Sequence, residues 1–385
     1  MNILHTVESY SPAVGGMAEA ARQISEGLVR LGHKVTVATG KMPERKEKTI
    51  NGVRITQFAV SGKAVFGIRG EVEKYRNFLI KSSFDVVTNF AAQQWATDIA
   101  LPILDRIQAK KVFVPTGFSG FYSPFYKNYF KKMKKWMKQY DMNIFLSDSY
   151  RDIDFARKNN IRKIKIIPNG ASKEEFLGKT TINIRKDLNI PGNHFLILSV
   201  ASHTGMKGHS EAIRIFNKAS IKKATLLIVG KHAKIYSGCY LQCQLLKFLN
   251  GKNILLKDLT REQTVAAFKA ADIFLFTSRV ECSPLVLFES MAAKTPFLTT
   301  DVGNSKEIIK WSKSGILLPT IINKKGLSRA LVSESATILE QIFDNSGKRK
   351  IMAERGFKVW LEQFTWEKIA RQYEHVYQKI SKSRP

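Results

Sequence analysis

The sequence predicts an α/β protein made of two doubly wound domains, and two observations lead to this prediction. Short, apolar, β-rich runs alternate with helical patterns along most of the 385 residues, as in parallel sheets that are covered by helices. At roughly 150 residues per domain, this length also suggests two domains. Because ligands of such sheets bind beyond the carboxyl ends of the strands, we expect the active site in the cleft between the domains.

The first half of the chain shows the alternation from its start. NILHTV is followed by a glycine-containing loop, a helix from about Met17 to Leu31 and the strand KVTVAT. This order is the signature of a parallel βαβ unit, and Gly32 is a suitable helix stop. Further strands are predicted at Val53–Phe58, Asp85–Thr88, Lys111–Pro115, Asn143–Leu146 and Lys163–Ile167.

A turn-rich stretch from Pro168 and a polar segment to Asn193 separate this series from a second one. The second series contains FLILSVA, ATLLIVG, NILLK, DIFLFTS, PFLTT and GILLP, which are apolar enough for strands buried on both faces. From about Lys325 onward the pattern indicates helices only. We therefore expect domains over residues 1–170 and 171–365, with a last helix at about 366–385 that packs back on the first domain.

The chain is strongly basic. Lys and Arg number 62 against 32 Asp and Glu, which gives a net charge of +30. Such a field attracts polyanions, including nucleic acid, anionic membranes and phosphorylated ligands. Lysines spread over solvated faces would give the same count. No nucleic-acid recognition motif is present, so we expect no specific nucleic-acid partner.

The cysteines and the hydropathy indicate a cytoplasmic protein. The chain has 3 cysteines, Cys239, Cys243 and Cys282, which are too few for a disulfide framework and fit a reducing compartment. Cys239 and Cys243 have helical spacing, but no second ligand pair accompanies them, so we expect buried thiols and no metal site. Without a signal peptide or an apolar run of about 18 residues, we expect at most peripheral attachment at the inner face of the cell membrane.

Two loops that follow a strand and open a helix are candidates for a ligand site. In SPAVGGMAE, Gly15 and Gly16 let a ligand approach backbone N–H groups at a helix start, although a tight turn with positive φ would need the same glycines. In SVASHTGMKGHSEAI, Lys207 stands at a helix start, where its charge opposes the helix dipole and is unfavourable for stability. A bound phosphate would offset this cost, so the position indicates a phosphate site. We expect the flanking His203 and His209 to be structural.

A third loop lies in FLFTSRVECSPLVLFESMAAK. Ser283 is a good N-cap, and Pro284 suits the first helical position. Glu281 is therefore expected in the loop at the carboxyl end of a strand, and Glu289 in the second turn of the helix. The spacing alone carries little information, because two glutamates at this distance occur often by chance. Their positions would let both reach one elongated ligand.

The segment DIFLFTSRVECSPLVLFESMAAKTPFLTTDVGNSKEII resembles the E-x7-E donor-site signature of family 4 retaining glycosyltransferases, which have the GT-B fold. SPAVGGMAEAARQISEGLVRLGHKVTVAT, SVASHTGMKGHSEAI and IIPNGAS also resemble this family, and the matches cover nearly the whole chain in the family's order. The resemblance implies two Rossmann-like domains. It also implies transfer of a sugar, with retention of configuration, from a nucleoside-diphosphate-sugar to a glycan or lipid-linked acceptor in cell-surface glycan synthesis, such as lipopolysaccharide or capsule.

The resemblance implies a role for each matching residue. Glu281 lies by the donor sugar, Glu289 binds the ribose hydroxyls and Lys207 contacts the diphosphate. Glu281 and Lys207 are the catalytic candidates. The other donor-site candidates are Gly15, Gly16, Ser202, Cys282, Ser283, Pro284 and Leu285. No convincing Asp-x-Asp metal motif follows a strand, so we expect lysine and helix dipoles to act without a metal or other cofactor.

Two positions depart from the family pattern. Ser202 stands where many relatives carry an arginine five positions before the lysine, so one phosphate contact is missing or supplied elsewhere. Thr116, followed by Gly117, stands where relatives often have a histidine near the reacting centre, which makes both residues candidates for sugar or acceptor contact. A sugar-nucleotide epimerase of the same fold and a non-catalytic basic protein that binds polyanions are the alternative functions.

Residues 117–143 mix aromatic side chains with lysines at near-helical spacing. A basic amphipathic helix with aromatic residues can lie on an anionic membrane. The other interpretation is a helix whose apolar face packs in the domain core and whose basic face is solvated. We favour the membrane, which would bring the active site close to a lipid-linked acceptor.

Overall fold

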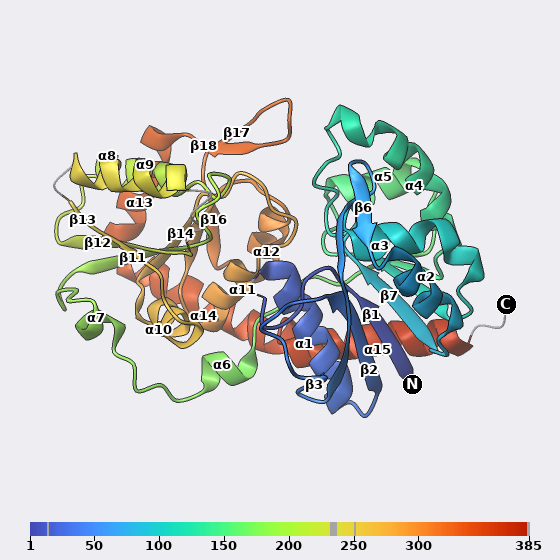
Figure 1. Ribbon diagram of the computed structural model, residues 1–385. Coiled ribbons are helices and arrows are strands. Elements are labelled where there is room, and N and C mark those ends of the chain that lie inside the picture. Colours follow the sequence, from blue (N-terminus) through green and yellow to red (C-terminus); the bar gives the residue numbers. More distant parts are fainter. Residues whose placement is uncertain (14, 232–236, 250–251, 383–385) are drawn as a thin grey trace. The chain divides into compact units, whose positions relative to one another are not determined.

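The computed structural model describes residues 1–13, 15–231, 237–249 and 252–382 (Figure 1). The chain divides into two compact units. The first consists of Met1–Asn169 together with Trp366–Pro385, and the second of Gly170–Thr365. Each unit is built around a largely parallel sheet with helices against it.

The first unit contains an eight-stranded sheet with the order β10-β9-β8-β7-β1-β2-β4-β3. Every neighbouring pair is parallel except β3 with β4. The strand order reverses between β1 and β7, and ligands of doubly wound sheets bind at such a switch point. The strands are β1 (Asn2–Thr6), β2 (Lys34–Gly40), β3 (Thr49–Ile50), β4 (Val53–Phe58), β7 (Val86–Phe90), β8 (Lys110–Val114), β9 (Met142–Phe145) and β10 (Ile164–Ile166), with β5 (Val60–Lys63) and β6 (Gly67–Gly70) in a separate hairpin.

The last helix of the chain belongs to the first unit, where it packs along the first helix (Figure 1). Its Tyr377 hydroxyl lies 3.1 Å from Nε2 of His5 and 2.7 Å from Oγ1 of Thr88, and all three side chains are fully buried. This helix therefore completes the core of the first unit. The helices of this unit are α1 (Gly16–Arg30), α2 (Val72–Lys81), α3 (Trp95–Ala100), α4 (Lys127–Gln139), α5 (Arg151–Lys158) and α15 (Trp366–Lys382), with 3₁₀ helices at Leu101–Arg106 and Pro124–Tyr126.

A glycine sets how closely α1 and α15 approach. A Cβ on Gly27 would lie 2.6 Å from the Cβ of Ala370. Although alanine is a better helix former than glycine, we expect Gly27→Ala to destabilise the first unit by about 1–3 kcal/mol through overpacking. The double variant Gly27→Ala/Ala370→Gly should recover most of this loss in thermal unfolding. Gly347→Ala, whose Cβ would meet only Asn345 Oδ1 at 3.8 Å, is the control; an equal loss there would contradict the packing argument.

The second unit contains a six-stranded sheet with the order β13-β12-β11-β14-β15-β16, in which all neighbours are parallel. The strand order reverses between β11 and β14, which makes this pair the switch point of the sheet. The strands are β11 (Phe195–Val200), β12 (Ala224–Val229), β13 (Asn253–Lys257), β14 (Ile273–Phe276), β15 (Phe297–Thr299) and β16 (Gly315–Leu317).

Alternate residues of these strands supply two separate cores, because side chains of a strand point to opposite faces. Leu196 and Leu198 belong to one buried cluster, and Phe195 and Ile197 to the other. Both faces are apolar, which explains the continuous hydrophobic runs. The helices are α6 (Lys173–Leu177), α7 (Ile184–Asp187), α8 (His209–Lys218), α9 (Ser237–Phe248), α10 (Arg261–Ala270), α11 (Leu285–Ala292), α12 (Ser305–Ser312), α13 (Val332–Asp344) and α14 (Ser346–Gln363).

The strands named in the sequence analysis are present, within about two residues of the predicted bounds. The prediction of helices only after Lys325 is wrong, because β18 (Ser328–Ala330) pairs antiparallel with β17 (Thr320–Ile322). These strands are three residues long, too short to show alternation. The stretch that separates the two series of strands contains α6 and α7.

The burial of α4 corrects the expectation for residues 117–143. Tyr129, Phe130, Met133 and Met137 are buried in the core of the first unit, while the lysines of this helix are exposed. The apolar face is therefore used for packing and does not face a membrane. Phe125 and Tyr122 just before the helix remain exposed. Among the described residues, no helix is both long and apolar enough to cross a membrane.

Candidate functional site

Lys207 and Glu281 meet at the switch point of the second sheet. Lys207 lies in the loop after β11 and Glu281 in the loop after β14, and these two strands are neighbours. Lys207 Nζ donates to Glu281 Oε1 at 2.6 Å, and Ser278 Oγ donates to the same oxygen at 2.9 Å. Both members of the ion pair are partly exposed, with 26% of the Lys207 side chain and 17% of that of Glu281 accessible. The pair can therefore contact a ligand.

The Lys207 loop is held against the end of β14 by a glycine. Gly208 has φ +70°, and a Cβ there would lie 1.8 Å from the carbonyl oxygen of Thr277. The Thr277 hydroxyl donates to the Gly208 carbonyl at 2.7 Å. Gly208 is also the N-cap of α8, which places the free N–H groups of this helix beside Lys207. The result is a cation and a helix N-terminus at one edge of the sheet.

Glu289 lies in the second turn of α11, as the sequence predicts, and pairs with an arginine that the sequence analysis missed. Arg261 Nη2 lies 2.6 Å from Glu289 Oε1 and 2.6 Å from Glu175 Oε2. Burial lowers the pKa of Arg261, but the two carboxylates outweigh this effect and raise the pKa above its usual value. Arg261 is the first residue of α10, where it opposes the helix dipole. The argument that identified Lys207 could therefore have identified Arg261.

The loop between the two glutamates begins its helix one residue later than predicted. Pro284 occupies the N-cap position and α11 starts at Leu285. The N-cap role predicted for Ser283 is therefore wrong; the Ser283 hydroxyl accepts a hydrogen bond from Asn304 Nδ2 at 3.1 Å. Asn304 also donates its backbone N–H to Cys282 O. Asn304 thus fixes the loop of Cys282 and Ser283 from a distant segment.

Ser202 is exposed in the loop that leads to Lys207, and the two histidines beside it are buried. His209 Nε2 lies 2.9 Å from the carbonyl oxygen of Ala201. Burial lowers the pKa of His209 to about 4, so this ring is neutral and donates to the carbonyl. His203 and Cys239 lie together, with 3.7 Å between Nδ1 and Sγ.

In the first unit, Gly15 and Gly16 lie at the start of α1, in the loop after β1 at that unit's switch point. Gly15 has φ 166°, which is extended backbone. The alternative of a tight turn with positive φ is therefore wrong for Gly15, and Gly16 is helical. The start of this loop is held by Arg45, whose guanidinium donates to the carbonyls of Ser11 and Tyr10, each at 2.6 Å.

Thr116 and Gly117 follow β8 in a constrained loop. Thr116, Gly117 and Phe118 have φ of 59°, 95° and 49°, a region that a β-branched residue such as threonine rarely adopts. The Gly117 N–H donates to the carboxylate of Asp152 at 2.8 Å. Burial raises the pKa of Asp152 to about 6. Backbone strain of this kind is concentrated at functional sites, which supports the choice of Thr116 as a site candidate.

The strain at Thr116 leads to a prediction. Thr116→Gly should stabilise the first unit by about 1 kcal/mol, because glycine adopts positive φ without strain. If Thr116 contacts the sugar or the acceptor, sugar transfer should fall in the same variant. Asn160→Gly is the control, since asparagine tolerates its φ of 55° and little strain would be relieved. Unchanged or lower thermal stability of Thr116→Gly relative to this control would contradict the strain argument.

Among the predicted residues, the structure brings together Lys207 and Glu281, with Gly208 and Ser278 around them. Glu289 lies on the adjoining helix and is engaged by Arg261. The loop residues Cys282, Ser283, Pro284 and Leu285 connect these two groups along the chain. This arrangement combines a lysine, helix N-termini and carboxylates, which is suited to an anionic ligand that also carries hydroxyl groups.

Comparison with known proteins indicates the class of protein to which this fold is similar. Residues 180–359 match the family model of glycosyl transferases group 1, and residues 14–175 match that of Glycosyltransferase Family 4. An uncharacterized glycosyltransferase of Methanocaldococcus jannaschii is 24% identical, over 98% of each chain. Sucrose-phosphate synthase of Thermosynechococcus elongatus has a TM-score of 0.81 at 17% identity, over 98% of both chains. HepE of Anabaena, solved with UDP and glucose, has a TM-score of 0.76 at 15% identity, over 98% of this chain and 100% of its own.

The two family models match adjacent parts of the chain, and together they span both units. The fold is that of the GT-B glycosyltransferases, with two Rossmann-like units. Both of the family models that match the chain describe glycosyltransferases.

Proposed function

We propose that this glycosyltransferase moves a sugar from a nucleoside-diphosphate-sugar to a glycan or lipid-linked acceptor of the cell surface, with retention of anomeric configuration. The observation that carries the proposal is the contact between Lys207 and Glu281 at the switch point, with 2.6 Å between Nζ and Oε1. It rests also on the two glycosyltransferase family models that match the chain and on the fold shared with HepE, whose structure holds UDP and glucose.

In this proposal Lys207 and the N-terminus of α8 stabilise the leaving diphosphate. Cleavage of the bond to the sugar builds negative charge on the phosphate oxygen and positive charge on the sugar. A fixed ammonium group and free N–H groups aimed at the developing negative charge lower the barrier. Glu281 accepts hydrogen bonds from Lys207 and Ser278 at the same carboxylate oxygen. It would position the sugar and stabilise its positive charge.

Each of the remaining site candidates is assigned to one part of the proposed donor, which is the ribose, the diphosphate or the sugar. Glu289 would accept hydrogen bonds from the ribose hydroxyls, and Arg261 would fix its carboxylate. The loop of Cys282, Ser283, Pro284 and Leu285 would present backbone to the sugar and phosphates, while Ser202 cannot supply the charge of an arginine.

The first unit would contribute the acceptor side. Gly15 and Gly16 would approach the donor phosphates, and Thr116 and Gly117 the acceptor. The exposed lysines of α4 would favour an anionic membrane surface or an anionic acceptor by charge alone, because the apolar face of the helix is buried.

Retention is proposed to occur by front-face attack of the acceptor. Glu281 and Glu289 are assigned to different ends of the donor, so they do not flank one bond as the carboxylates of glycoside hydrolases do. The phosphate charge would be met by Lys207 and helix N-termini without Mg²⁺ or Mn²⁺.

A panel of nucleoside-diphosphate-sugars, tested by thermal shift, would test the donor assignment. A donor at 100 times its Kd stabilises the fold by about 2.7 kcal/mol, so a matching sugar-nucleotide should raise the Tm of the wild type and not of Lys207→Met. A panel without any such shift would contradict the proposed donor class.

Product analysis with the matching donor would then test the reaction. Formation of a glycosylated acceptor separates a transferase from an epimerase, which would convert the donor without an acceptor. Proton NMR of the product reports the anomeric configuration. A product with inverted configuration would contradict the proposed retention but not the proposed sugar transfer. We expect sugar transfer to continue after Mg²⁺ and Mn²⁺ are removed from the assay. Loss of transfer on their removal would contradict the proposed absence of a catalytic metal.

A further inference from the structure

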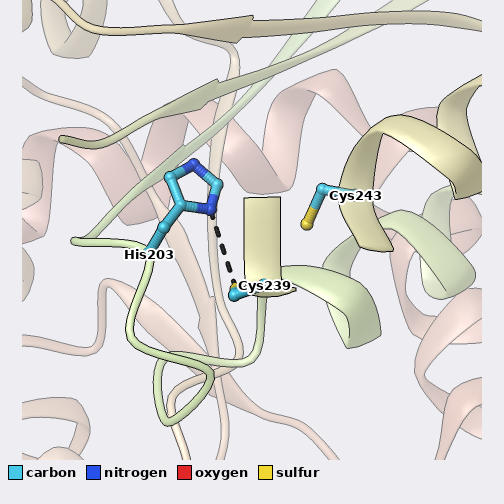
Figure 2. Close-up of side chains that lie close together, drawn as sticks. All are labelled: His203, Cys239 and Cys243. Carbon is cyan, nitrogen blue, oxygen red and sulfur yellow. Dashed lines mark hydrogen bonds between the residues drawn. The ribbon is translucent and has the colours of Figure 1, made fainter. Parts of the chain in front are cut away.

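Three potential metal ligands from separate parts of the second unit lie together beside the Lys207 loop. His203 comes from the loop after β11, and Cys239 and Cys243 from α9. One ligand atom from each residue lies within 4.8 Å of the other two, and Figure 2 shows the three side chains close together. We call these residues the His203–Cys239–Cys243 cluster.

The distances in this cluster are close to those of a zinc site. With Zn–S near 2.3 Å and Zn–N near 2.0–2.1 Å, ligand atoms of a tetrahedral site are about 3.5–3.8 Å apart. His203 Nδ1 and Cys239 Sγ are 3.7 Å apart. The two cysteines are one helical turn apart, so both sulfur atoms lie on one face of α9. A small adjustment of side chains would place all three ligand atoms around one ion.

The imidazole is held in place by its surroundings. The backbone N–H of His203 donates to Lys231 O at 3.1 Å, and the ring packs edge-on against Tyr240, with centroids 5.4 Å apart. In the neighbouring loop after β12, a Cβ at Gly230 would lie 1.9 Å from Ala201 O of the His203 loop, so glycine is required for the close approach of the two loops. A ligand fixed in this way loses little conformational entropy when a metal binds.

The chemistry of the three ligands selects the class of metal. Two thiolates and an imidazole suit Zn²⁺, while Mg²⁺ and Ca²⁺ prefer oxygen ligands. His203 is 1% exposed and Cys243 is fully buried, with Cys239 only partly accessible. The proposed transfer uses none of these side chains. The sequence offers no second ligand pair to the cysteines, but the fold brings a histidine to them.

We propose that His203, Cys239 and Cys243 bind one Zn²⁺ ion, with the fourth position open to water. Such a site would join α9 to the loop that carries Lys207, four residues after His203, and would thereby stabilise the second unit. The role is structural and separate from the proposed sugar transfer, so it stands whether or not the donor assignment is correct.

Metal binding by the full chain tests the proposal directly. The purified, reduced protein is freed of metal with a chelator and titrated with Co²⁺, which gives an intense thiolate-to-cobalt absorption band only when sulfur is bound. Zn²⁺ should displace Co²⁺ at about one ion per chain. Zn²⁺ should also raise the Tm of the wild type, because a ligand that binds the native state stabilises it, whereas Mg²⁺ should not.

Serine variants identify the ligands. Loss of a residue that only hydrogen-bonds to a metal ligand typically costs roughly 10–100-fold in affinity. Loss of a direct ligand should cost more, so Cys239→Ser and Cys243→Ser should weaken Zn²⁺ binding by more than roughly a hundredfold. The matched control is Cys282→Ser, which removes the remaining cysteine of the chain and should leave Zn²⁺ affinity unchanged. Circular dichroism of each variant shows whether it is folded.

Three results would overturn the proposal. The first is a wild-type titration without a thiolate-to-cobalt band, which needs no variant. The second is Zn²⁺ binding by the folded Cys239→Ser and Cys243→Ser variants as tight as that of the wild type. The third is a Cys239–Cys243 disulfide that persists in the reducing buffer, which would show that the two sulfur atoms pair with each other instead.

Discussion

Replacing Lys207 with methionine is expected to lower kcat/KM for sugar transfer by roughly 10²–10³-fold, the usual cost of removing one fixed charge-stabilising group. Methionine keeps much of the length and packing of the side chain but cannot donate to a phosphate. It also leaves Glu281 without the ammonium that lies 2.6 Å away. The measurement is steady-state transfer with the donor found by thermal shift.

A control lysine separates this effect from the general charge of the protein. Lys294 pairs with Glu354 on the surface of the same unit, at 3.0 Å, and Lys294→Met should leave transfer within about twofold because exposed pairs contribute little. Glu281→Gln should reduce transfer without unfolding the unit, because an amide can still accept from Ser278. Full activity of Lys207→Met or Glu281→Gln would contradict the site assignment.

Replacing Gly208 with alanine is expected to destabilise the second unit by about 2–6 kcal/mol. A Cβ there would lie 1.8 Å from Thr277 O, and the positive φ adds strain; each effect typically costs about 1–3 kcal/mol. Relief of the clash would move the loop away from β14 and separate Lys207 from Glu281. Thermal unfolding and the transfer assay should therefore both change.

The matched control lies in the same loop. Gly205 has φ +74°, but a Cβ there would meet nothing within 4 Å. Gly205→Ala should cost only the strain, about 1 kcal/mol, so its Tm should lie between those of the wild type and Gly208→Ala. Equal losses in the two alanine variants would show that backbone conformation, and not the close approach to Thr277, determines the effect.

The sequence predicts most of the fold because the strands are buried on both faces and read as continuous apolar runs. The hairpin of β17 and β18 escapes prediction since each strand is three residues long. Residues 117–143 show a limit of a different kind. Their periodicity indicates an amphipathic helix but cannot say whether its apolar face meets a membrane or the protein core, and the structure assigns it to the core.

The site is predicted in part for a similar reason. A helix start after a strand identifies Lys207, Glu281 and Glu289, because these positions are set locally. Ser278, which donates to Glu281 from three residues earlier, is also a local partner. Arg261, the partner of Glu289, and Asn304, the partner of Ser283, are brought to the site by tertiary contacts. Arg261 could have been predicted from the local sequence, because a cation at the start of a helix opposes the helix dipole. His203 likewise reaches the two cysteines only through the packing of α9 beside the β11 loop.

The return of α15 to the first unit has a consequence for biosynthesis. Tyr377, which fills the space beside His5 and Thr88, is translated after the whole of the second unit. The first unit therefore cannot complete its core during translation until the whole of the second unit has been made. A nascent chain that stops before Trp366 would expose the face of α1 that packs against α15, so we expect ribosome-bound intermediates of this enzyme to depend on chaperones.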